Sequence, residues 1–399
     1  MTSRPHVLIV GAGIGGLTAA LALLKKGFDV DVYEQASELK EVGAGLQISA
    51  NGTRVLYALG VGDEVKRLSV EPDGKEVRLW NTGQAWKLFD LGAQSIERFG
   101  FPYFMVYRPD LHRVLVDAVR RENPAAIHLD AKCTGFLQKE DKVILQLQDG
   151  KTVAGDALIG ADGVHSRMRE VLFGADRPEF SGCIAWRGVI PIERLPRRLI
   201  RSVGTNWIGP GGHVVHYPLR GGKLMNFVGI VERNDWVIES WSERGTREEC
   251  ANDFKGWHED IHELIRNVDV LYKWALMVRA PMDRWSVGRA TLLGDACHPM
   301  LPFLAQGAVM AIEDGYLLAR SFEKYGDEVE VALRHYENAR RDRTRRAVLG
   351  SAENAKRFHS QTLRDAEAAQ EYVDHEWSEE RVKQRYYWLF EYNVETVPI

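Results

Sequence analysis

Three side chains capable of acid–base chemistry occur close together in the segment HVVHYPL, residues 213–219. A neutral histidine can accept a proton from a weakly acidic hydroxyl near pH 7, and a tyrosine can orient such a hydroxyl by hydrogen bonding. The segment reads as a β-strand, so His213 and Tyr217 share one face and His216 points to the other. Only one of the two histidines can easily face a given site, and either could instead be satisfied within a sheet.

The elements that would position such a site begin at the N-terminus. An apolar run at residues 7–10 leads into Gly11-x-Gly13-x-x-Gly16, and apolar residues then recur at helical spacing. The first glycine permits a tight turn, the second lets a pyrophosphate approach the backbone, and the third lets helix and strand pack closely. A second apolar strand ends at Glu34, whose carboxylate can accept hydrogen bonds from a ribose and disfavours a 2′-phosphate. The sequence therefore predicts a site for FAD or NAD rather than NADP.

Two later loops again place glycine and aspartate after an apolar strand, as Asp162-Gly163 and as Gly294-Asp295. Side chains at the carboxyl ends of parallel strands face a ligand crevice. A helix of small residues begins near Gln306, shortly after the second loop. Because the N-terminal end of a helix is positive, we expect this end to point back at the same ligand.

The bulk composition is that of an ordinary globular protein. The 399 residues exceed the size of most single cores, so two domains or one large composite are expected. A net charge of -4 gives no global reason to bind nucleic acid or an anionic membrane. The six arginines between Arg334 and Arg346 interleave with Glu337 and Asp342 and indicate a solvated helix face. No long apolar run or signal-peptide core occurs, which favours a cytoplasmic protein without membrane spans.

The four cysteines lie far apart and lack metal-ligand spacing, so we expect reduced thiols. Cys297 and His298 are adjacent, but they have no partner ligands at a suitable spacing. No metal site is therefore predicted.

The segments GAGIGG, GADGVHSR and LLGDACHPMLPFLAQGAVMAIED resemble, in order and content, the single-component FAD-dependent aromatic hydroxylases, the class A flavoprotein monooxygenases. The resemblance spans nearly the whole chain and points to the branch of salicylate hydroxylase and 3-hydroxybenzoate 6-hydroxylase. It also covers EVGAGLQ (41–47), YRPDLH (107–112) and GPGGHVVHYPLRGG (209–222). The expected FAD contacts are Gly11, Gly13, Gly16, Glu34, Ala44, Gly45, Arg108, Asp162, Gly163, Gly294, Asp295, Pro299, Gly307 and Ala308.

The implied fold class is α/β, with a Rossmann-like FAD-binding domain, a second, mainly antiparallel β domain for the substrate, and C-terminal helices. The alternating, aromatic-rich strands after about residue 180 support the second domain. The predicted division gives residues 1–72, 100–178 and 280–345 to the FAD-binding domain, 73–99 and 179–279 to the substrate domain, and 346–399 to the C-terminal helical region.

The chemistry that the resemblance implies has two halves, and FAD carries the difficult part of both. NADH or NADPH reduces the flavin from a surface groove, because the chain has no second complete glycine fingerprint. The reduced flavin then traps O₂ as a C4a-hydroperoxide, which hydroxylates an electron-rich ring. The 3-hydroxybenzoate branch has a histidine that matches His213, so His213 is the expected base and Tyr217 its partner in catalysis. The expected substrate contacts are His213, His216, Tyr217, Pro302 and Gln306.

The implied substrate is a small phenolic aromatic acid. The 3-hydroxybenzoate enzymes carry a substrate-contacting glutamine where this chain has Pro302, and this departure favours a salicylate-type acid, whose hydroxylation can expel the carboxylate. Hydroxylation of 3-hydroxybenzoate or 6-hydroxynicotinate is the alternative, and the oligomeric state, for which a homodimer is one option, stays open. Two remoter hypotheses are a flavoprotein for a larger apolar substrate and a noncatalytic flavin-binding redox sensor, which would show no turnover.

Overall fold

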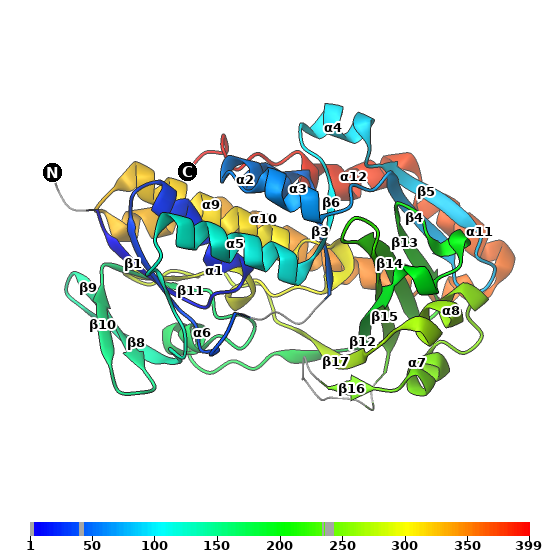
Figure 1. The fold of residues 1–399 in the computed structure, drawn as a ribbon, viewed down its shortest axis with the longest axis horizontal. Helices are drawn as coiled ribbons and strands as arrows, with labels where there is room; N and C mark the ends of the chain where they lie inside the picture. The colour runs from blue at the N-terminus through cyan, green and yellow to red at the C-terminus, as the bar shows by residue number, and fades with distance from the viewer. Residues whose placement is uncertain (1–3, 40–43, 234, 236–242) are drawn as a thin grey trace.

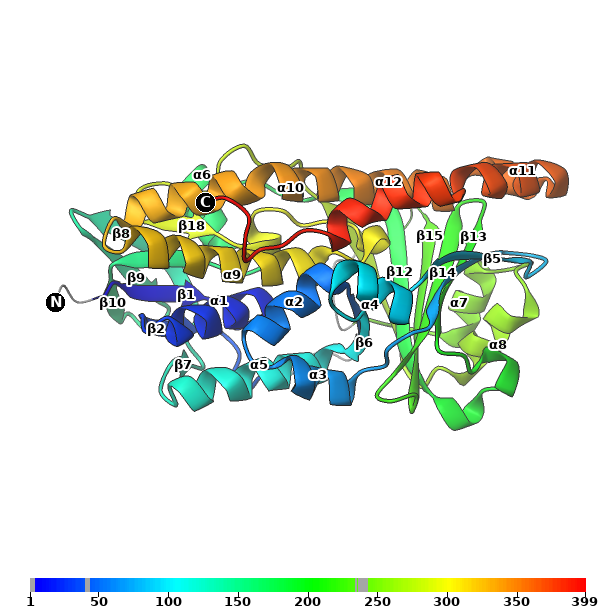
Figure 2. The ribbon, with the colours of Figure 1, turned by 90° about the horizontal axis from the view of Figure 1, so that it is seen from above.

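The computed structural model describes the chain except for residues 1–3, 40–43, 234 and 236–242. The first three residues of the EVGAGLQ segment therefore lie outside the described part. Two sheets of different kinds lie side by side along the long axis of the molecule (Figure 1). Long helices from the C-terminal part run past both of them (Figure 2).

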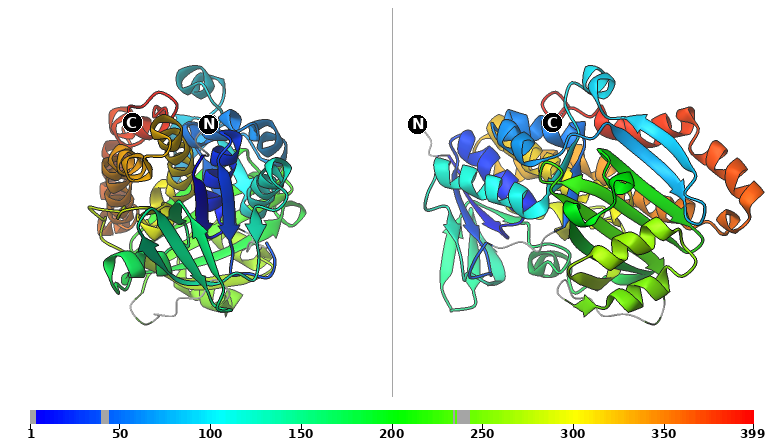
Figure 3. Two further views of the ribbon diagram at one scale, coloured as in Figure 1. Left: turned by 90° about the vertical axis from the view of Figure 1, so that its left-hand side faces the viewer. Right: turned by 45° about the vertical axis from the view of Figure 1, so that its right-hand side comes forward.

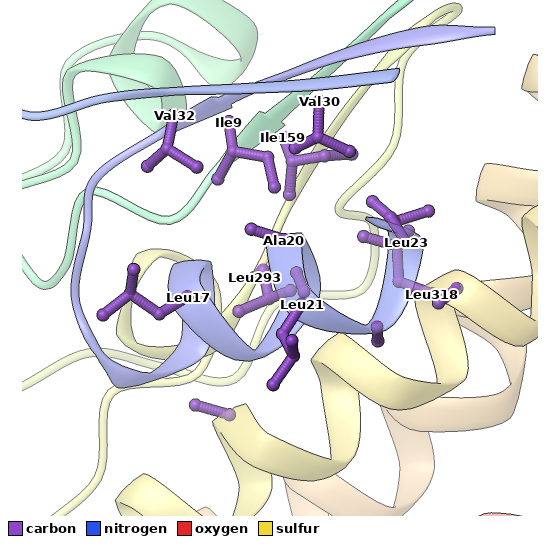
Figure 4. Close-up of a cluster of buried hydrophobic side chains, with 14 of the residues drawn as sticks. Ile9, Leu17, Ala20, Leu21, Leu23, Val30, Val32, Ile159, Leu293 and Leu318 are labelled. Carbon is purple, nitrogen blue, oxygen red and sulfur yellow. The ribbon is translucent and has the colours of Figure 1, made fainter. Parts of the chain in front are cut away.

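The first sheet is parallel, with the strand order β18-β11-β1-β2-β7. Its strands are β1 (His6–Val10), β2 (Asp29–Tyr33), β7 (Ile127–His128), β11 (Ala157–Gly160) and β18 (Ala290–Leu292). Helix α1 (Ile14–Lys25) connects β1 to β2 and packs against α9 (Gly307–Tyr325). Leu17 and Ala20 of α1 meet Ile9 of β1 in a dry cluster (Figure 4). Burial of these apolar faces holds the glycine loop at the carboxyl ends of the strands.

Smaller elements surround the parallel sheet. An antiparallel sheet contains β8 (Cys133–Lys139), β9 (Lys142–Leu147) and β10 (Thr152–Gly155), and β3 (Gly45–Ile48) pairs with β6 (Phe104–Tyr107). The helices here are α2 (Ala50–Ala58), α3 (Gly62–Leu68), α5 (Arg108–Glu122) and α6 (Arg167–Phe173). Strands β9 and β10 form a hairpin, and α5 begins directly after β6.

The second sheet has eight strands in the order β16-β17-β12-β15-β14-β13-β4-β5. They are β4 (Gly74–Leu79), β5 (Ala85–Asp90), β12 (Glu179–Pro191), β13 (Val203–Gly209), β14 (Gly212–Leu219), β15 (Leu224–Glu232), β16 (Arg244–Gly245) and β17 (Leu271–Val278). All neighbours are antiparallel except β13 and β4. Helices α7 (Arg247–Asp253) and α8 (Glu259–Asn267) cover one face of this sheet (Figure 3). Their apolar residues form a buried cluster with Trp186, Trp207 and Phe227. The opposite face packs partly against the C-terminal helices and turns toward the half of the molecule that contains the parallel sheet.

The C-terminal part is helical. It contains α10 (Val329–Phe358), α11 (Ala366–Glu376) and α12 (Glu379–Phe390), and α4 (Ala93–Phe99) packs near α12 through Phe99 and Tyr387. Helix α10 extends from beside the parallel sheet to the eight-stranded sheet (Figure 2). The predicted division at residues 345 and 346 therefore falls within one continuous helix.

The expectation of a solvated arginine face on α10 is wrong for Arg340 and Arg343. The buried guanidinium of Arg340 donates to Glu313 at 2.5 Å and to Asp314 at 2.6 Å, and Arg343 donates to Glu313 at 2.8 Å. The spacing of charges along α10 could not reveal these partners, because both carboxylates come from α9. The paired charges tolerate burial because each has an opposite partner, and they fix α9 against α10.

Within the described residues, no helix is long and apolar enough to cross a membrane, and no group of three or more side chains could hold a metal ion. The four cysteines are free and buried, and burial raises the pKa of the Cys133 thiol to about 12. They behave as small apolar side chains rather than as reactive thiols.

Candidate active site

A cavity of about 370 Å³ lies between the two halves of the molecule. One wall consists of the loops that follow β1, β11 and β18, together with β3 and the starts of α5 and α9. The other wall is the inner face of β12, β14, β15 and β17. The first wall includes Gly13, Gly45, Arg108, Gly163, Gly294, Asp295, Pro299, Pro302, Gly307 and Ala308, and the second includes Ala185, Arg187, His213, Val215, Tyr217, Val228, Ile230 and Trp274.

The glycine loop has the shape that a dinucleotide requires. A Cβ on Gly11 would lie 2.4 Å from the carbonyl oxygen of Ala161, and one on Gly16 would lie 2.0 Å from that of Gly11. These two positions therefore accept only glycine. A Cβ on Gly13 would meet no protein atom within 4 Å, and Gly13 lines the cavity at the N-terminus of α1. Its backbone is thus open to a phosphate, which the positive end of the helix would attract.

We expect the substitution Gly13→Ala to weaken FAD binding by about tenfold, which corresponds to about 1.4 kcal/mol. The added methyl group would occupy the space through which the pyrophosphate approaches the backbone. Titration of the apoprotein with FAD, followed by flavin fluorescence, measures the effect.

The matched control for this substitution is Gly92→Ala, because a Cβ at Gly92 also meets no atom within 4 Å but lies outside the cavity lining. Both apoproteins should unfold at the temperature of the parent protein. Equal FAD affinity in the two variants would contradict a phosphate position at Gly13.

Glu34 lies beside the glycine loop, and Arg108 lines the cavity. The carboxylate of Glu34 accepts hydrogen bonds from the N–H groups of Ala12 and Ala36, each at 2.9 Å. It is therefore fixed beside the glycine loop but outside the cavity lining. Arg108 begins α5, where its backbone N–H donates to the oxygen of Ala44 at 2.9 Å, and it lines the cavity itself. Ala44 is buried and contributes this backbone contact rather than a cavity surface.

Asp162 serves the loop more than the cavity. One carboxylate oxygen accepts a hydrogen bond from the hydroxyl of Ser166 at 2.5 Å, and the other accepts from the N–H of Met168 at 3.1 Å. Burial raises the pKa of the Asp162 carboxyl. These bonds hold the turn in which Gly163 adopts a φ of +79° and lines the cavity.

A buried aspartate of α9 binds the loop after β18 and holds it in place. Asp314 accepts hydrogen bonds from the N–H of Gly294 at 3.1 Å and pairs with Nε2 of His298 at 2.6 Å. Asp295 lines the cavity and is exposed to it, and partial loss of solvent between the cavity walls raises the pKa of its carboxyl. His298 thus has a structural role in holding this loop.

The N-terminus of α9 faces the cavity through Gly307 and Ala308. Gln306, expected to contact the substrate, points elsewhere. Its amide nitrogen donates to the hydroxyl of Ser49 at 3.0 Å, and its oxygen accepts from Asn51 at 3.2 Å. These buried partners satisfy the amide, so Gln306 does not line the cavity, whereas Pro302 does.

His213 and Tyr217 both reach the cavity from β14, as the strand alternation predicts. Nδ1 of His213 lies 2.7 Å from Nε2 of His359, which leaves Nε2 of His213 for a ligand. Burial, with a smaller contribution from His359, holds the pKa of His213 well below its usual value. Burial also raises the pKa of the Tyr217 hydroxyl. His213 is therefore neutral, and so able to accept a proton, at neutral pH.

His216 belongs to the opposite face of the sheet. Its Nε2 accepts a hydrogen bond from the indole N–H of Trp207 at 3.1 Å, and burial lowers its pKa to about 4. It does not line the cavity. The expectation that His216 contacts the substrate is therefore wrong, because successive residues of a strand alternate between faces.

Sequence reasoning missed Arg187. This residue lies in β12, lines the cavity, and stacks its guanidinium 3.9 Å above the ring of Trp274. Burial, with a contribution from Arg108, lowers its pKa to about 9, so it is still a cation at neutral pH. The signal was present in the segment CIAWRGVIPI, where one charge interrupts a strand that is otherwise apolar.

The fold and the cavity together define a dinucleotide-binding oxidoreductase in which a second site faces the cofactor. The sequence matches the FAD binding domain family over residues 4–351, and the chain belongs to this family. The open backbone at Gly13 and the two helix N-termini that face the cavity fit FAD. The chain's relatives over almost its whole length are aromatic-ring monooxygenases and hydroxylases, and the protein is an FAD-dependent aromatic-ring monooxygenase.

Two relatives illustrate the family. The chain is 38% identical to 3-amino-4-hydroxybenzoate 2-monooxygenase of Streptomyces platensis, with 94% of this chain and 96% of the relative covered. It is 35% identical to 3-hydroxybenzoate 6-hydroxylase of Polaromonas naphthalenivorans, with 97% and 96% covered.

Solved structures agree with this fold. HpxO of Klebsiella pneumoniae, solved with FAD and uric acid, is 28% identical, covers 98% of this chain with 97% of its own, and has a TM-score of 0.83. A salicylate hydroxylase substrate complex has a TM-score of 0.82 with full coverage of both chains, but at 24% identity it supports the fold alone.

Proposed function

We propose that the protein hydroxylates a small phenolic aromatic acid. The observation that carries this proposal is the composition of the cavity wall opposite the flavin cradle. That wall combines a neutral histidine, a half-buried arginine and a buried tyrosine with apolar side chains. A flat apolar ring with one hydroxyl and one carboxylate complements each of these groups.

Each polar group of this wall has a task. His213 accepts the proton of the substrate hydroxyl, which makes the ring more electron-rich and so a better nucleophile. Arg187 pairs with the carboxylate, and Tyr217, which interacts electrostatically with Arg187, donates a hydrogen bond to the same group. FAD, when bound, supplies the redox chemistry: it accepts a hydride from NADH or NADPH and uses O₂ to deliver one oxygen atom to the ring. The N-terminus of α9 favours negative charge on the reduced cofactor.

The strand register gives the separation of the two recognition groups. His213 pairs with Ile230, and Val228, two residues along β15, pairs with Arg187 on the next strand. Two strand spacings and two residues along the strand place the Cα atoms of His213 and Arg187 about 12 Å apart on one face. Side chains of these lengths can bracket a ring whose hydroxyl and carboxylate lie apart.

This separation favours a 3- or 4-hydroxybenzoate over salicylate, whose hydroxyl and carboxylate are adjacent. The names of the two hydroxybenzoate-acting relatives support the same choice. The salicylate-type substrate favoured by Pro302 therefore becomes the second candidate.

The test is stopped-flow reduction of the bound flavin by NADH and by NADPH, with a panel of aromatic acids. The panel contains salicylate, 3-hydroxybenzoate, 4-hydroxybenzoate, 3-amino-4-hydroxybenzoate and 6-hydroxynicotinate, and mass spectrometry identifies the products. We expect one of the meta or para acids to accelerate reduction and to gain one oxygen atom. If salicylate is the best substrate, the assignment of the hydroxyl to His213 and of the carboxylate to Arg187 is wrong. If no acid is hydroxylated, the proposed function is wrong.

A further inference from the structure

The histidine in the cavity is the first member of a hydrogen-bonded chain that leads to the surface. Nδ1 of His213 lies 2.7 Å from Nε2 of His359, and Nδ1 of His359 lies 3.0 Å from an oxygen of Glu232. The side chain of His359 is 1% exposed, whereas that of Glu232 is 53% exposed. The chain therefore connects the closed cavity to solvent through three side chains.

The three residues come from separate elements that the fold fixes together. His213 is near the start of β14, Glu232 ends β15, and His359 caps the C-terminus of α10. The backbone oxygen of His359 accepts a hydrogen bond from the N–H of Gly211 at 3.1 Å, and the oxygen of Gly211 accepts from the N–H of Glu232 at 2.9 Å. The end of α10 is thus tied to the turn that precedes β14.

Aromatic and weakly acidic side chains surround the inner part of this chain. Phe303 and Phe358 pack against the ring of His213, with ring centroids at 4.9 and 5.1 Å. Cys183 is the cross-strand partner of Glu232, and burial raises the pKa of its thiol to about 11. The hydrogen bond from His359 lowers the pKa of the Glu232 carboxyl, so Glu232 is ionised at neutral pH.

An ionised carboxylate can only accept hydrogen bonds, and when His359 is neutral this fixes the direction of every bond in the chain. Glu232 requires the proton of His359 to be on Nδ1, so Nε2 of a neutral His359 carries a lone pair. That lone pair in turn requires the proton of His213 to be on Nδ1. The lone pair of His213 is then on Nε2, the ring nitrogen that is left for the cavity.

We propose that His359 and Glu232 hold His213 in its proton-accepting tautomer and conduct the substrate proton to solvent. The proton of the substrate hydroxyl binds Nε2 of His213, the proton on Nδ1 of His213 moves to Nε2 of His359, and the proton on Nδ1 of His359 moves to Glu232 and then to water. One proton enters and one leaves, with no change in oxidation state. His359 and Glu232 are positioning residues for this step, which rests on the proposed function only in the identity of the proton donor.

The tautomer is tested without turnover. Protein labelled with ¹⁵N-histidine contains 12 histidines, and long-range ¹H–¹⁵N spectra report which ring nitrogen carries each proton. Spectra of His213→Gln and His359→Phe assign the two rings. We expect both rings to be protonated on Nδ1 in the parent protein, and Glu232→Leu to shift His359, and with it His213, toward protonation on Nε2. An Nε2–H form of His213 in the parent protein would overturn the proposal whatever the enzyme hydroxylates.

Kinetics test the proton path. With the acid identified from the substrate panel, His359→Phe should lower the hydroxylation kcat by about 10- to 100-fold, because water must replace the relay. KM and flavin reduction by NADH should not change, and the rate should rise with pH as the substrate loses its own proton. His359→Gln, which keeps a polar side chain, should recover part of the rate.

The matched control is His335→Phe. His335 lies on the same helix and stacks on Tyr325, with ring centroids 4.2 Å apart, and a phenylalanine can keep this stacking. This variant should behave as the parent protein. If the parent hydroxylates its substrate and His359→Phe shows the same rate and pH profile, the relay is wrong while the proposed function stands. If the parent hydroxylates no acid, the proposed function fails and the ¹⁵N spectra still decide the tautomer.

Discussion

Replacement of His213 by alanine is expected to lower the hydroxylation kcat by about 10²- to 10⁴-fold, the usual contribution of a positioned general base. The loss should be largest near neutral pH, where the substrate hydroxyl is still protonated. At a pH above the pKa of that hydroxyl, the substrate arrives already ionised, so the variant should regain much of its rate. The hydroxylated product, quantified by chromatography at a series of pH values, measures this effect alongside NADH consumption.

The parent protein should keep its activity to a lower pH than the variant. A base is inactive when protonated, so its rate falls as pH falls through its pKa. Because burial holds the pKa of His213 well below 6.5, we expect kcat to stay level through pH 6.5 and to fall only at lower pH. His216→Asn is the control, since His216 lies on the same strand but faces away from the cavity. An unchanged kcat in His213→Ala would exclude His213 as the base.

Replacement of Arg187 by glutamine is expected to raise KM for the aromatic acid by about 30-fold to several thousand-fold. This range corresponds to the 2–5 kcal/mol that removal of one partner from a buried charge pair costs. Glutamine keeps a polar side chain of similar length but cannot neutralise a carboxylate. Steady-state kinetics with the acid and with its uncharged carboxamide measure the effect.

The carboxamide separates charge recognition from general damage to the cavity. The parent protein should prefer the acid strongly, whereas Arg187→Gln should treat the two compounds nearly alike. Arg187→Lys should fall between them, because an ammonium retains the charge but loses the planar, bidentate geometry and the stacking on Trp274. Equal losses for the acid and the carboxamide would mean that Arg187 supports the wall rather than binds the carboxylate.

The division of the cavity into two walls explains why these substitutions should act on different steps. The flavin cradle is made mainly of backbone, at Gly13, Gly163 and Gly307. The opposite wall is made of side chains on a hydrogen-bonded sheet, which holds them more rigidly than loops would. Changes at His213 and Arg187 should therefore leave FAD bound, and the flavin absorbance spectrum provides the check.

The sequence predicts the strand, glycine turn and helix at the N-terminus, because these features depend on local backbone shape. Gly11, Gly13 and Gly16 follow one strand and precede one helix, so their spacing carries the geometry. The same holds for His213 and Tyr217, whose shared face follows from strand periodicity alone.

The partners of the buried polar side chains follow from long-range packing and could not be predicted from the sequence. His359 lies 146 residues beyond His213, and nothing local indicates that the end of α10 meets β14. The sequence predicts solvated side chains for Arg340 and Arg343, but both pair with carboxylates of α9. It also predicts a substrate contact for Gln306, whose amide instead binds Ser49 and Asn51. A pattern along the chain reports periodicity and local conformation, whereas the partners of a buried polar group come from distant segments that packing brings together.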